Sequence, residues 1–184
     1  MKIAAYCAYL LAWLVFAIAA VAGALPRLRK QNQPMAASAI QAQVFIGTLL
    51  QVAAAFAITW SIPSGPLHPR TFELAGAVLL APLGAALFVW ALRSVPRDAD
   101  DDTLVTGGAY AWLRHPIYLA FLAILVATGF LISGGANLIL PVFLYLGGSE
   151  LRIASEEGEL TKKFPKDYAQ YRSRTRWRYL PGLR

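Results

Sequence analysis

Two polar stretches carry the residue types that could do chemistry, and they border one apolar segment. The first, residues 103–118, places Arg114, His115 and Pro116 immediately before apolar sequence resumes. Pro116 suits the first turn of a helix, where a missing backbone donor does no harm, and His115 would then be the cap. The free amides of a helix start favour an anion, so Arg114 and His115 are candidates to bind a carboxylate or phosphate. Alternatively, both side chains anchor the helix in the lipid headgroup layer.

The second stretch, residues 152–171, predicts a helix that carries charged pairs. Arg152 and Glu156 lie four residues apart and can meet on one helix surface. On spacing alone, a surface pair and a functional pair are equally good interpretations. Glu159 and Lys163 share the same spacing, but a solvated surface pair explains them better.

Glu157 differs from its acidic neighbours because it lies on an apolar stripe of the same predicted helix. Ile153, Glu157, Leu160 and Phe164 follow helical spacing, so the Glu157 carboxylate points the same way as apolar side chains. A carboxylate on that side needs a partner. Glu157 is therefore a candidate functional residue in its own right.

The elements that position these residues are apolar enough to cross a bilayer. The chain has 184 residues, of which 58% are hydrophobic and 15% charged, whereas soluble domains are about a quarter charged. Several uncharged runs approach or exceed the roughly 18 residues that a membrane span needs. One cysteine and two histidines argue against a disulfide and a metal site. The net charge of +7 gathers at the ends of apolar runs, which indicates membrane contact rather than nucleic-acid binding.

The apolar pattern predicts an all-α, polytopic membrane protein of about five transmembrane helices. The expected spans are residues 3–25, 40–62 and 72–92, with a kink at Pro82, followed by a helical hairpin over 116–146 that turns at Ser133–Gly135. We expect a single domain, 1–184. Residues 1–93 would supply three N-terminal helices, and residues 94–184 a polar loop, the hairpin and a helical C-terminal tail.

Basic residues predict the orientation of these helices. If the N-terminus is outside, the basic flank at 27–30, the loop at 94–115 and the tail at 152–184 all lie in the cytoplasm, as the positive-inside rule requires. The hairpin then returns the two polar stretches to one cytoplasmic site. The tail aromatics favour an interfacial belt on anionic lipid over RNA stacking; they are Tyr168, Tyr171, Trp177 and Tyr179.

Taken together, the two stretches resemble a known pair of families. LVTGGAYAWLRHPIY, then a hydrophobic hairpin, then EEGELTKKFPKDYAQYRSRTRWRYLP resembles the isoprenylcysteine carboxyl methyltransferase and phospholipid methyltransferase families over residues 103–181. The sequence departs from the family pattern at Ala109, Ala120 and Pro165. These departures concern backbone geometry rather than the expected contacts.

The resemblance implies a five-helix membrane enzyme that takes S-adenosylmethionine from the cytosol, releases S-adenosylhomocysteine and methylates a lipophilic acceptor from the bilayer. Arg152 would face the acceptor, and Arg152 and Glu157 are the catalytic candidates. The resemblance favours Glu156 as a donor contact while helical periodicity favours Glu157, so which of the two glutamates contacts the donor stays open. Arg114, at the same helix start as His115, is a further donor-binding candidate. The remaining implied donor contacts are Thr103, Leu104, Val105, Tyr110, His115, Pro116, Ile117 and Tyr118.

The residue types suit this chemistry. Aromatic faces and carboxylates suit a sulfonium cation and its ribose hydroxyls. Methyl transfer needs proximity and orientation, so neither a metal nor a nucleophilic residue is expected. The acceptor is a prenylated carboxylate that Arg152 positions, or a phospholipid amine whose proton an acidic group helps to remove. Its choice would be encoded in the first two spans, which match the families only in hydrophobicity.

Two other classes of protein stay open, as does the oligomeric state. A sterol-reductase-type oxidoreductase would share a similar C-terminal arrangement and use NADPH. A non-catalytic membrane subunit or transporter is the other alternative. The sequence argues against a transporter because no charged residue lies near the middle of any span.

Overall fold

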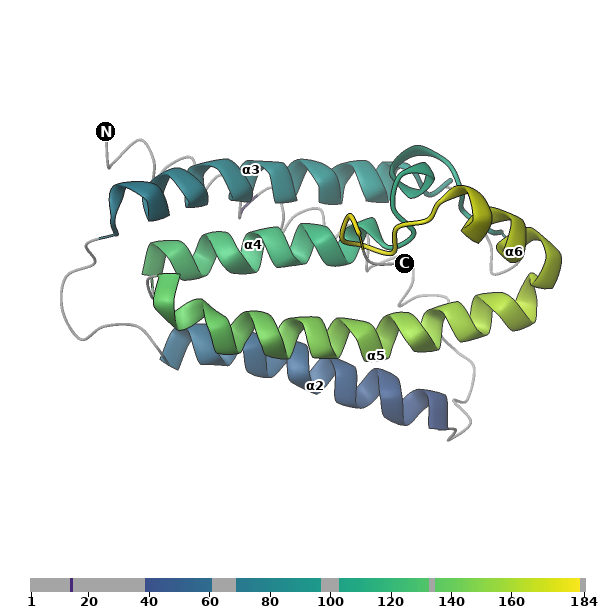
Figure 1. The fold of residues 1–184 in the computed structure, drawn as a ribbon, viewed down its shortest axis with the longest axis horizontal. Helices are drawn as coiled ribbons and strands as arrows, with labels where there is room; N and C mark the ends of the chain where they lie inside the picture. The colour runs from purple at the N-terminus through teal and green to yellow at the C-terminus, as the bar shows by residue number, and fades with distance from the viewer. Residues whose placement is uncertain (1–13, 15–38, 61–68, 97–102, 133–134, 183–184) are drawn as a thin grey trace.

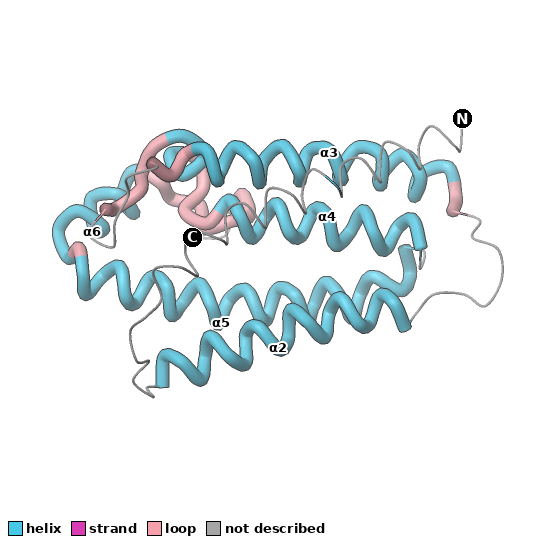
Figure 2. The backbone as a smooth tube through the Cα atoms, turned by 180° about the vertical axis from the view of Figure 1, so that it is seen from behind, coloured by secondary structure: helices cyan, strands magenta, loops and turns pink. Residues whose placement is uncertain are grey.

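The described part of the chain is entirely helical. The computed structural model describes residues 14, 39–60, 69–96, 103–132 and 135–182, and within these ranges it contains no strand (Figures 1 and 2). Its elements are α2 (Ala39–Trp60), α3 (Thr71–Arg93), the 3-10 helix η1 (Gly108–Ala111), α4 (Pro116–Ile132), the 3-10 helix η2 (Gly135–Leu138), α5 (Ile139–Lys163) and α6 (Pro165–Arg174). The all-α prediction is confirmed over these ranges.

The predicted helices agree closely with the structure. α2 and α3 cover the spans expected at 40–62 and 72–92, and α3 continues through Pro82. By length and composition, α3 is the one described helix that could cross a membrane, while the apolar parts of α2 and α4 are shorter. The expected span 3–25, its basic flank at 27–30 and the polar residues 97–102 lie outside the described residues.

The hairpin differs from the prediction in its second arm. The expected arm ends at residue 146, with a separate polar helix after it, but α5 runs unbroken for 25 residues to Lys163. At about 1.5 Å per residue this helix is roughly 37 Å long, so it carries the charged residues well beyond the apolar segment. The helix ends where Pro165 begins α6, because proline has no backbone donor and suits a first helical turn.

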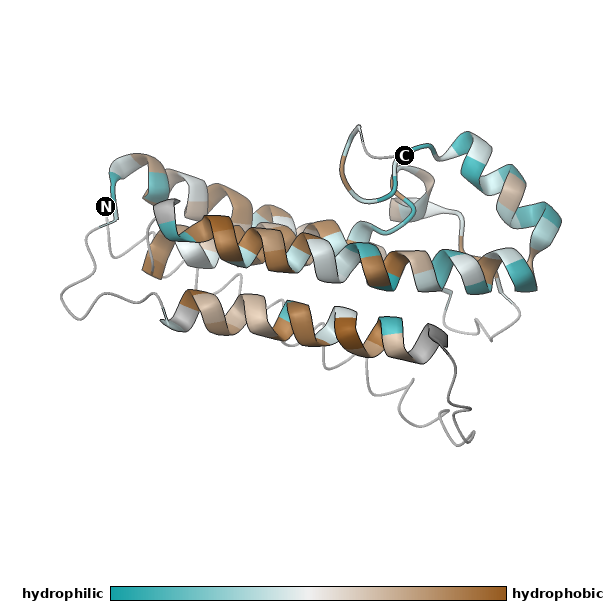
Figure 3. Ribbon diagram, turned by 60° about the horizontal axis from the view of Figure 1, so that its bottom comes forward, coloured by the Kyte–Doolittle hydropathy of each residue, from teal (hydrophilic) through white to brown (hydrophobic). Residues whose placement is uncertain are grey.

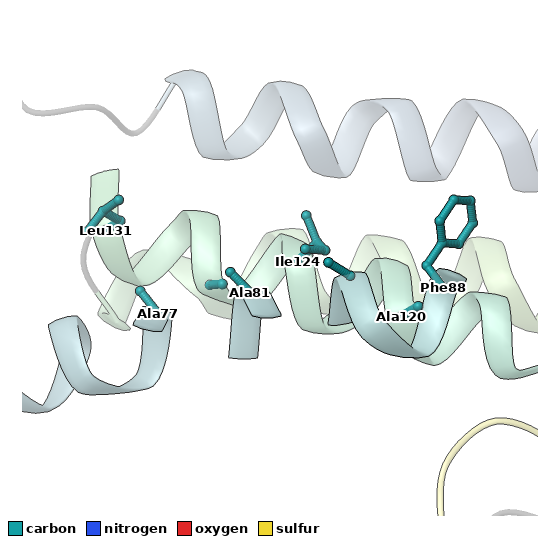
Figure 4. Close-up of a cluster of buried hydrophobic side chains, with 8 residues drawn as sticks. Ala77, Ala81, Phe88, Ala120, Ile124 and Leu131 are labelled. Atoms are coloured by element: carbon teal, nitrogen blue, oxygen red, sulfur yellow. The ribbon is translucent and has the colours of Figure 1, made fainter. Parts of the chain in front are cut away.

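The four long helices pack as two close pairs, α3 with α4 and α2 with α5 (Figure 1). Small side chains line the α3–α4 contact, where Ala81 and Ala120 are fully buried (Figure 4). Gly84 lies there too, because an added Cβ would come within 2.9 Å of the Ala120 carbonyl oxygen. Small residues let helix backbones approach closely where apolar burial alone does not discriminate between partners.

Glycines bring α2 and α5 equally close. A Cβ on Gly148 would lie 2.5 Å from the Gly47 carbonyl oxygen, and one on Gly47 would lie 2.7 Å from the Gly148 carbonyl oxygen. The two backbones therefore touch at this crossing. Since α4 packs mainly on α3, and α5 mainly on α2, the two hairpin arms leave room between the pairs.

Polar contacts hold the two ends of the bundle. At the turn of the hairpin, the Glu73 carboxylate accepts the backbone N–H of Gly135 at 2.8 Å and that of Arg70 at 2.7 Å. At the other end, the Ser94 hydroxyl oxygen accepts the backbone N–H of Ala109 at 3.0 Å. The first contact ties the start of α3 to η2, and the second ties its end to η1.

The α2–α5 crossing gives a test of the helix pairing. We expect Gly148→Ala to destabilise the protein by about 1–3 kcal/mol, because the new methyl group collides with the Gly47 backbone. Gly147→Ala is the matched control, since no atom lies within 4 Å of its added Cβ. The free energy of unfolding of this variant should be unchanged or higher by up to about 1 kcal/mol. Thermal unfolding of the purified variants measures both. Equal stability of the two variants would contradict the pairing.

Candidate functional site

A cavity of about 840 Å³ lies between α2, α4 and α5. Its lining combines a polar group at the start of α4 and the charged part of α5 with a long apolar wall. The lining residues are Thr48, Gln51, Val52, Ala55 and Ile58 of α2, Tyr110 of η1, His115, then Pro116, Ile117, Tyr118, Phe121, Ile124, Leu125 and Thr128 of α4, and Tyr145, Arg152 and Glu156 of α5. From Pro116 to Thr128 the wall extends about 18 Å along α4.

His115 connects the two arms of the hairpin across the mouth of this cavity. Its Nδ1 lies 3.3 Å from Glu156 Oε2, and its Nε2 lies 3.3 Å from Glu157 Oε1. The ring is 7% exposed. The predicted meeting of the His115 segment with the 152–157 helix is thus confirmed as geometry.

Glu156 faces the cavity within a row of polar side chains. The Tyr118 hydroxyl donates to Glu156 Oε1. Arg152 Nε donates to the Tyr118 hydroxyl oxygen at 3.0 Å, and Arg152 Nη2 lies 3.8 Å from Glu156 Oε1. The row therefore presents a cation, a phenol and a carboxylate in sequence along one side of the cavity.

Glu157 points away from the cavity, because successive side chains on a helix diverge by about 100°. Arg114 Nε donates to Glu157 Oε1 at 2.9 Å, and Arg178 Nε lies 3.6 Å from the same oxygen. The same guanidinium of Arg114 donates from Nη1 to the carbonyl oxygens of Thr175 and Arg176, both at 2.9 Å. Neither Glu157 nor Arg114 lines the cavity. Both instead fasten the C-terminal tail.

The tail pairs with the segment before α4 through its backbone as well. The N–H of Arg114 donates to the Trp177 carbonyl oxygen at 3.0 Å, and the N–H of His115 donates to the Arg178 carbonyl oxygen at 2.7 Å. These bonds leave the two backbone amides satisfied by protein. These two amides precede α4, so the anion seat predicted at the free amides of the helix start stays a prediction.

The tail aromatics correct the expected interfacial belt. Tyr168 and Tyr179 are each 1% exposed and Tyr171 is 7% exposed, whereas Trp177 is 43% exposed. The Tyr171 hydroxyl donates to the Tyr110 carbonyl oxygen at 2.7 Å. Three of the four aromatics are thus core residues of a folded tail, and Trp177 alone keeps the exposure that a belt residue needs.

The other predicted donor contacts divide into two groups. Tyr110, Pro116 and Ile117 line the cavity together with His115, Tyr118 and Glu156. Thr103 is exposed, Leu104 and Val105 are half-buried, and none of the three lines it. Leu104 lines a separate hollow of about 510 Å³ beside α6 instead.

Two polar residues of α2 were not predicted as site residues. Thr48 and Gln51 line the cavity on the same helix face as Val52, Ala55 and Ile58. Arg152 Nη1 donates to Thr48 Oγ1 at 3.1 Å, across 104 positions of sequence. The available signal was a hydroxyl and an amide three residues apart in an uncharged apolar run, which places both on one face of a helix.

The electrostatics of the His115 bridge set a pH dependence. Burial alone would raise the pKa of Glu157, but hydrogen bonds from His115 and Arg114 outweigh burial and lower it to about 2. Burial alone would lower the pKa of His115, but hydrogen bonds to Glu156 and Glu157 outweigh burial and raise it above its usual 6.5. The folded protein therefore favours ionised Glu157 and protonated His115.

These shifts predict how stability changes with pH. The contribution of Glu157 is present above its usual pKa of 4.5 and is lost as the pH falls toward 2. The contribution of His115 is complete below pH 6.5 and is lost as the pH rises through its raised pKa. We expect the difference in Tm between the native protein and His115→Gln to shrink as the pH rises above 6.5. A difference that is independent of pH would contradict the bridge.

Known proteins are similar to the part of the chain that contains most of the cavity lining. The model of the isoprenylcysteine carboxyl methyltransferase (ICMT) family matches residues 71–162, half of the chain. Protein-S-isoprenylcysteine O-methyltransferases of Saccharomyces cerevisiae and Schizosaccharomyces pombe are 32% and 34% identical over 74 residues, which are 40% of this chain and 31% of each relative. The Dictyostelium discoideum protein of that name is 31% identical over 84 residues, 46% of this chain and 35% of the relative.

The matched segment therefore covers about a third of the length of these relatives. The match to the family model runs from the start of α3 to one residue before the end of α5, and it includes His115, Tyr118, Arg152, Glu156 and Glu157. The part of the chain that builds one side of the cavity is thus the part that the family shares, and the chain belongs to the isoprenylcysteine carboxyl methyltransferase family.

Proposed function

We propose that the protein is an integral membrane methyltransferase that transfers a methyl group from S-adenosylmethionine to a lipophilic carboxylate. The observation that carries the proposal is the cavity itself, where Arg152, Tyr118, Glu156 and His115 adjoin an apolar wall of α2 and α4. A polar reaction centre that continues into an apolar chamber suits a water-soluble donor and a lipid-like acceptor. Family membership supports the same reaction class.

The donor half of the proposed site consists of Glu156, Tyr118, Tyr110 and His115. When bound, S-adenosylmethionine supplies a methyl group on a positively charged sulfur, which an acceptor attacks in line. Aromatic faces and a carboxylate attract such a cation. His115 lies between Glu156 and Glu157, whose hydrogen bonds raise its pKa and orient its ring beside the cavity. The residues present therefore fit the donor.

The acceptor half centres on Arg152 and the apolar wall. The wall extends about 18 Å along α4, which accommodates an extended hydrocarbon chain. A guanidinium pairs well with a carboxylate, and the names of the relatives specify an isoprenylcysteine and transfer to oxygen. A carboxylate acceptor is already ionised at neutral pH, so its methylation needs no general base. We therefore assign Arg152 a role in orienting the acceptor.

Glu157 acquires a different role in this proposal from that of Glu156. The sequence left open which of the two glutamates contacts the donor and suggested Glu157 as catalytic. Glu157 bonds Arg114 and His115 outside the cavity lining, while Glu156 lines the cavity. We propose that Glu157 positions His115 and the tail, and that Glu156 contacts the donor. Thr103 and Val105 would contribute to the donor site only indirectly.

We further propose that α2, α3, α4 and the apolar part of α5 cross the bilayer within a single domain. Large apolar side chains are exposed along these helices, including Phe45 and Phe56 of α2, Leu79 and Leu83 of α3, and Phe143 of α5. Soluble proteins rarely expose so much apolar surface. Hydrophilic residues gather at the end of α5, α6 and the tail (Figure 3). The positive-inside rule favours a cytoplasmic tail and donor site, with the N-terminus outside.

The two alternative classes find no support in the comparisons, because the matched family and the relatives are methyltransferases. A reductase would be recognised by stabilisation with NADPH and not with S-adenosylmethionine. A transporter would move solute into vesicles without binding either.

Donor binding tests the donor half directly. We expect the purified protein to bind S-adenosylmethionine, and Glu156→Gln to weaken the Kd about tenfold or more, since a hydrogen bond to a charged group contributes about 1.5–3 kcal/mol. Glu159→Gln is the matched control, because Glu159 is exposed on the same helix outside the cavity. Isothermal titration measures all three. Equal affinity of the two variants would remove Glu156 from the donor site.

The chemical stability of the methylated product distinguishes a carboxylate acceptor from an amine acceptor. We expect radiolabelled donor to label a lipid-soluble product when the protein is incubated with a prenylcysteine or with a total lipid extract. Because a methyl ester hydrolyses in mild base and an N-methyl group does not, base treatment should release the label as methanol. Base-stable label would contradict a carboxylate acceptor and favour an amine.

A further inference from the structure

The α2 helix lies outside the segment that the family shares, yet it supplies a complete face of the cavity. Thr48 and Gln51 are its polar members, and Val52, Ala55 and Ile58 continue the same face. A helix that contributes both polar and apolar groups to one cavity can contact both the polar head group and the hydrocarbon chain of an acceptor. The contacts of Arg152 indicate which α2 side chain contributes to binding of the head group.

Arg152 is the cation that would meet an anionic head, and its guanidinium is held from two other helices. Nε donates to the Tyr118 hydroxyl oxygen of α4 at 3.0 Å, and Nη1 donates to Thr48 Oγ1 of α2 at 3.1 Å. Of the five N–H groups of an arginine, these bonds use two. The guanidinium is thus fixed in direction while further N–H groups stay available to a ligand.

The hydroxyl of Thr48 has a fixed polarity. It donates its own hydrogen to the Val44 carbonyl oxygen at 2.8 Å, one helical turn earlier. Its lone pairs are therefore the part that meets Arg152. The neighbouring Gly47 makes room for the arginine, because a Cβ there would lie 2.7 Å from Arg152 Cγ. Consecutive residues of α2 thus admit the stem of Arg152 and anchor its head.

We infer that Thr48 is a positioning residue that aims Arg152 at the carboxylate of the acceptor, so that α2 determines the selectivity for an anionic head group. The inference rests on the proposed function, and it goes further by placing one determinant of acceptor recognition on α2, outside the segment that the family model matches. Thr48 acts on the acceptor through Arg152, and it makes no hydrogen bond of its own to Glu156 or His115, the proposed donor contacts.

The test compares Thr48→Val, which keeps the shape and removes the hydroxyl, with Thr48→Ser, which restores it. The probes are N-acetyl-S-farnesylcysteine and its carboxamide, which lacks the negative charge, each titrated in the presence of S-adenosylhomocysteine. We expect Thr48→Val to weaken binding of the carboxylate probe about tenfold, the usual effect of losing a hydrogen bond to a charged group. The native protein and Thr48→Val should bind the carboxamide with equal affinity. Thr48→Ser should bind the carboxylate probe as tightly as the native protein does.

Thr161→Val is the matched control, because Thr161 is an exposed threonine of α5 that also donates to a carbonyl of its own helix. It should bind both probes as the native protein does. The affinity of Thr48→Val for S-adenosylmethionine should stay within about twofold, since Thr48 does not contact Glu156 or His115; a general loss of structure would lower both affinities and the Tm together.

Three results would overturn the inference. The first is carboxylate affinity in Thr48→Val equal to that of the native protein. The second is an equal loss of donor and acceptor affinity in a variant of unchanged Tm. The third is a native protein that binds S-adenosylmethionine but not the carboxylate probe, which would remove the anionic head group and leave the donor half of the proposed function standing.

Discussion

The bridge from His115 to Glu156 and Glu157 is the interaction on which the rest of the site depends. The hairpin joins α4 and α5 at one end, but each arm packs mainly on a different partner, α4 on α3 and α5 on α2. At the opposite end, the two arms are connected by the His115 ring and by the Tyr118 hydroxyl. The bridge therefore closes the mouth of the hairpin while leaving a chamber behind it.

Glu156 and Glu157 both contact His115 but otherwise have different surroundings, because successive side chains of a helix point in different directions. Glu156 turns into the cavity, and Glu157 turns toward Arg114 and the tail. The tail in turn supplies carbonyl oxygens to the amides of Arg114 and His115. A carboxylate of the cavity lining, a buried ion pair and the attachment of the tail are thus linked through one imidazole.

The sequence predicts the local elements well and the long-range contacts poorly. Helix limits at α2, α3 and α4 follow from apolar runs and from Pro116, and the meeting of His115 with the 152–157 helix follows from the hairpin. The contacts of Arg114 and Glu157 were harder to predict, because tertiary packing brings them together and places the tail against both. The buried tyrosines of the tail resemble interfacial residues in composition, and only the fold distinguishes the two. Thr48 is 104 positions from Arg152, a contact that no local pattern indicates.

The small residues at the helix contacts and the cavity between the helix pairs are structurally related. Glycines and alanines bring α2 against α5 and α3 against α4, and this close pairing leaves the space between the pairs for the chamber. Most of its polar groups come from the segment that the family model matches, whereas one wall, including Thr48 and Gln51, comes from α2, which the model does not match. This division is consistent with the proposed donor site in the matched segment and with the proposed contribution of α2 to acceptor binding.

An experimental structure of the complex with S-adenosylhomocysteine tests the central claim most directly. The account predicts that the nucleoside product lies in the cavity against Tyr118 and Glu156, with His115 between Glu156 and Glu157 and with Arg152 facing the apolar wall of α2 and α4. A product bound elsewhere, or a His115 ring distant from both glutamates, would contradict it.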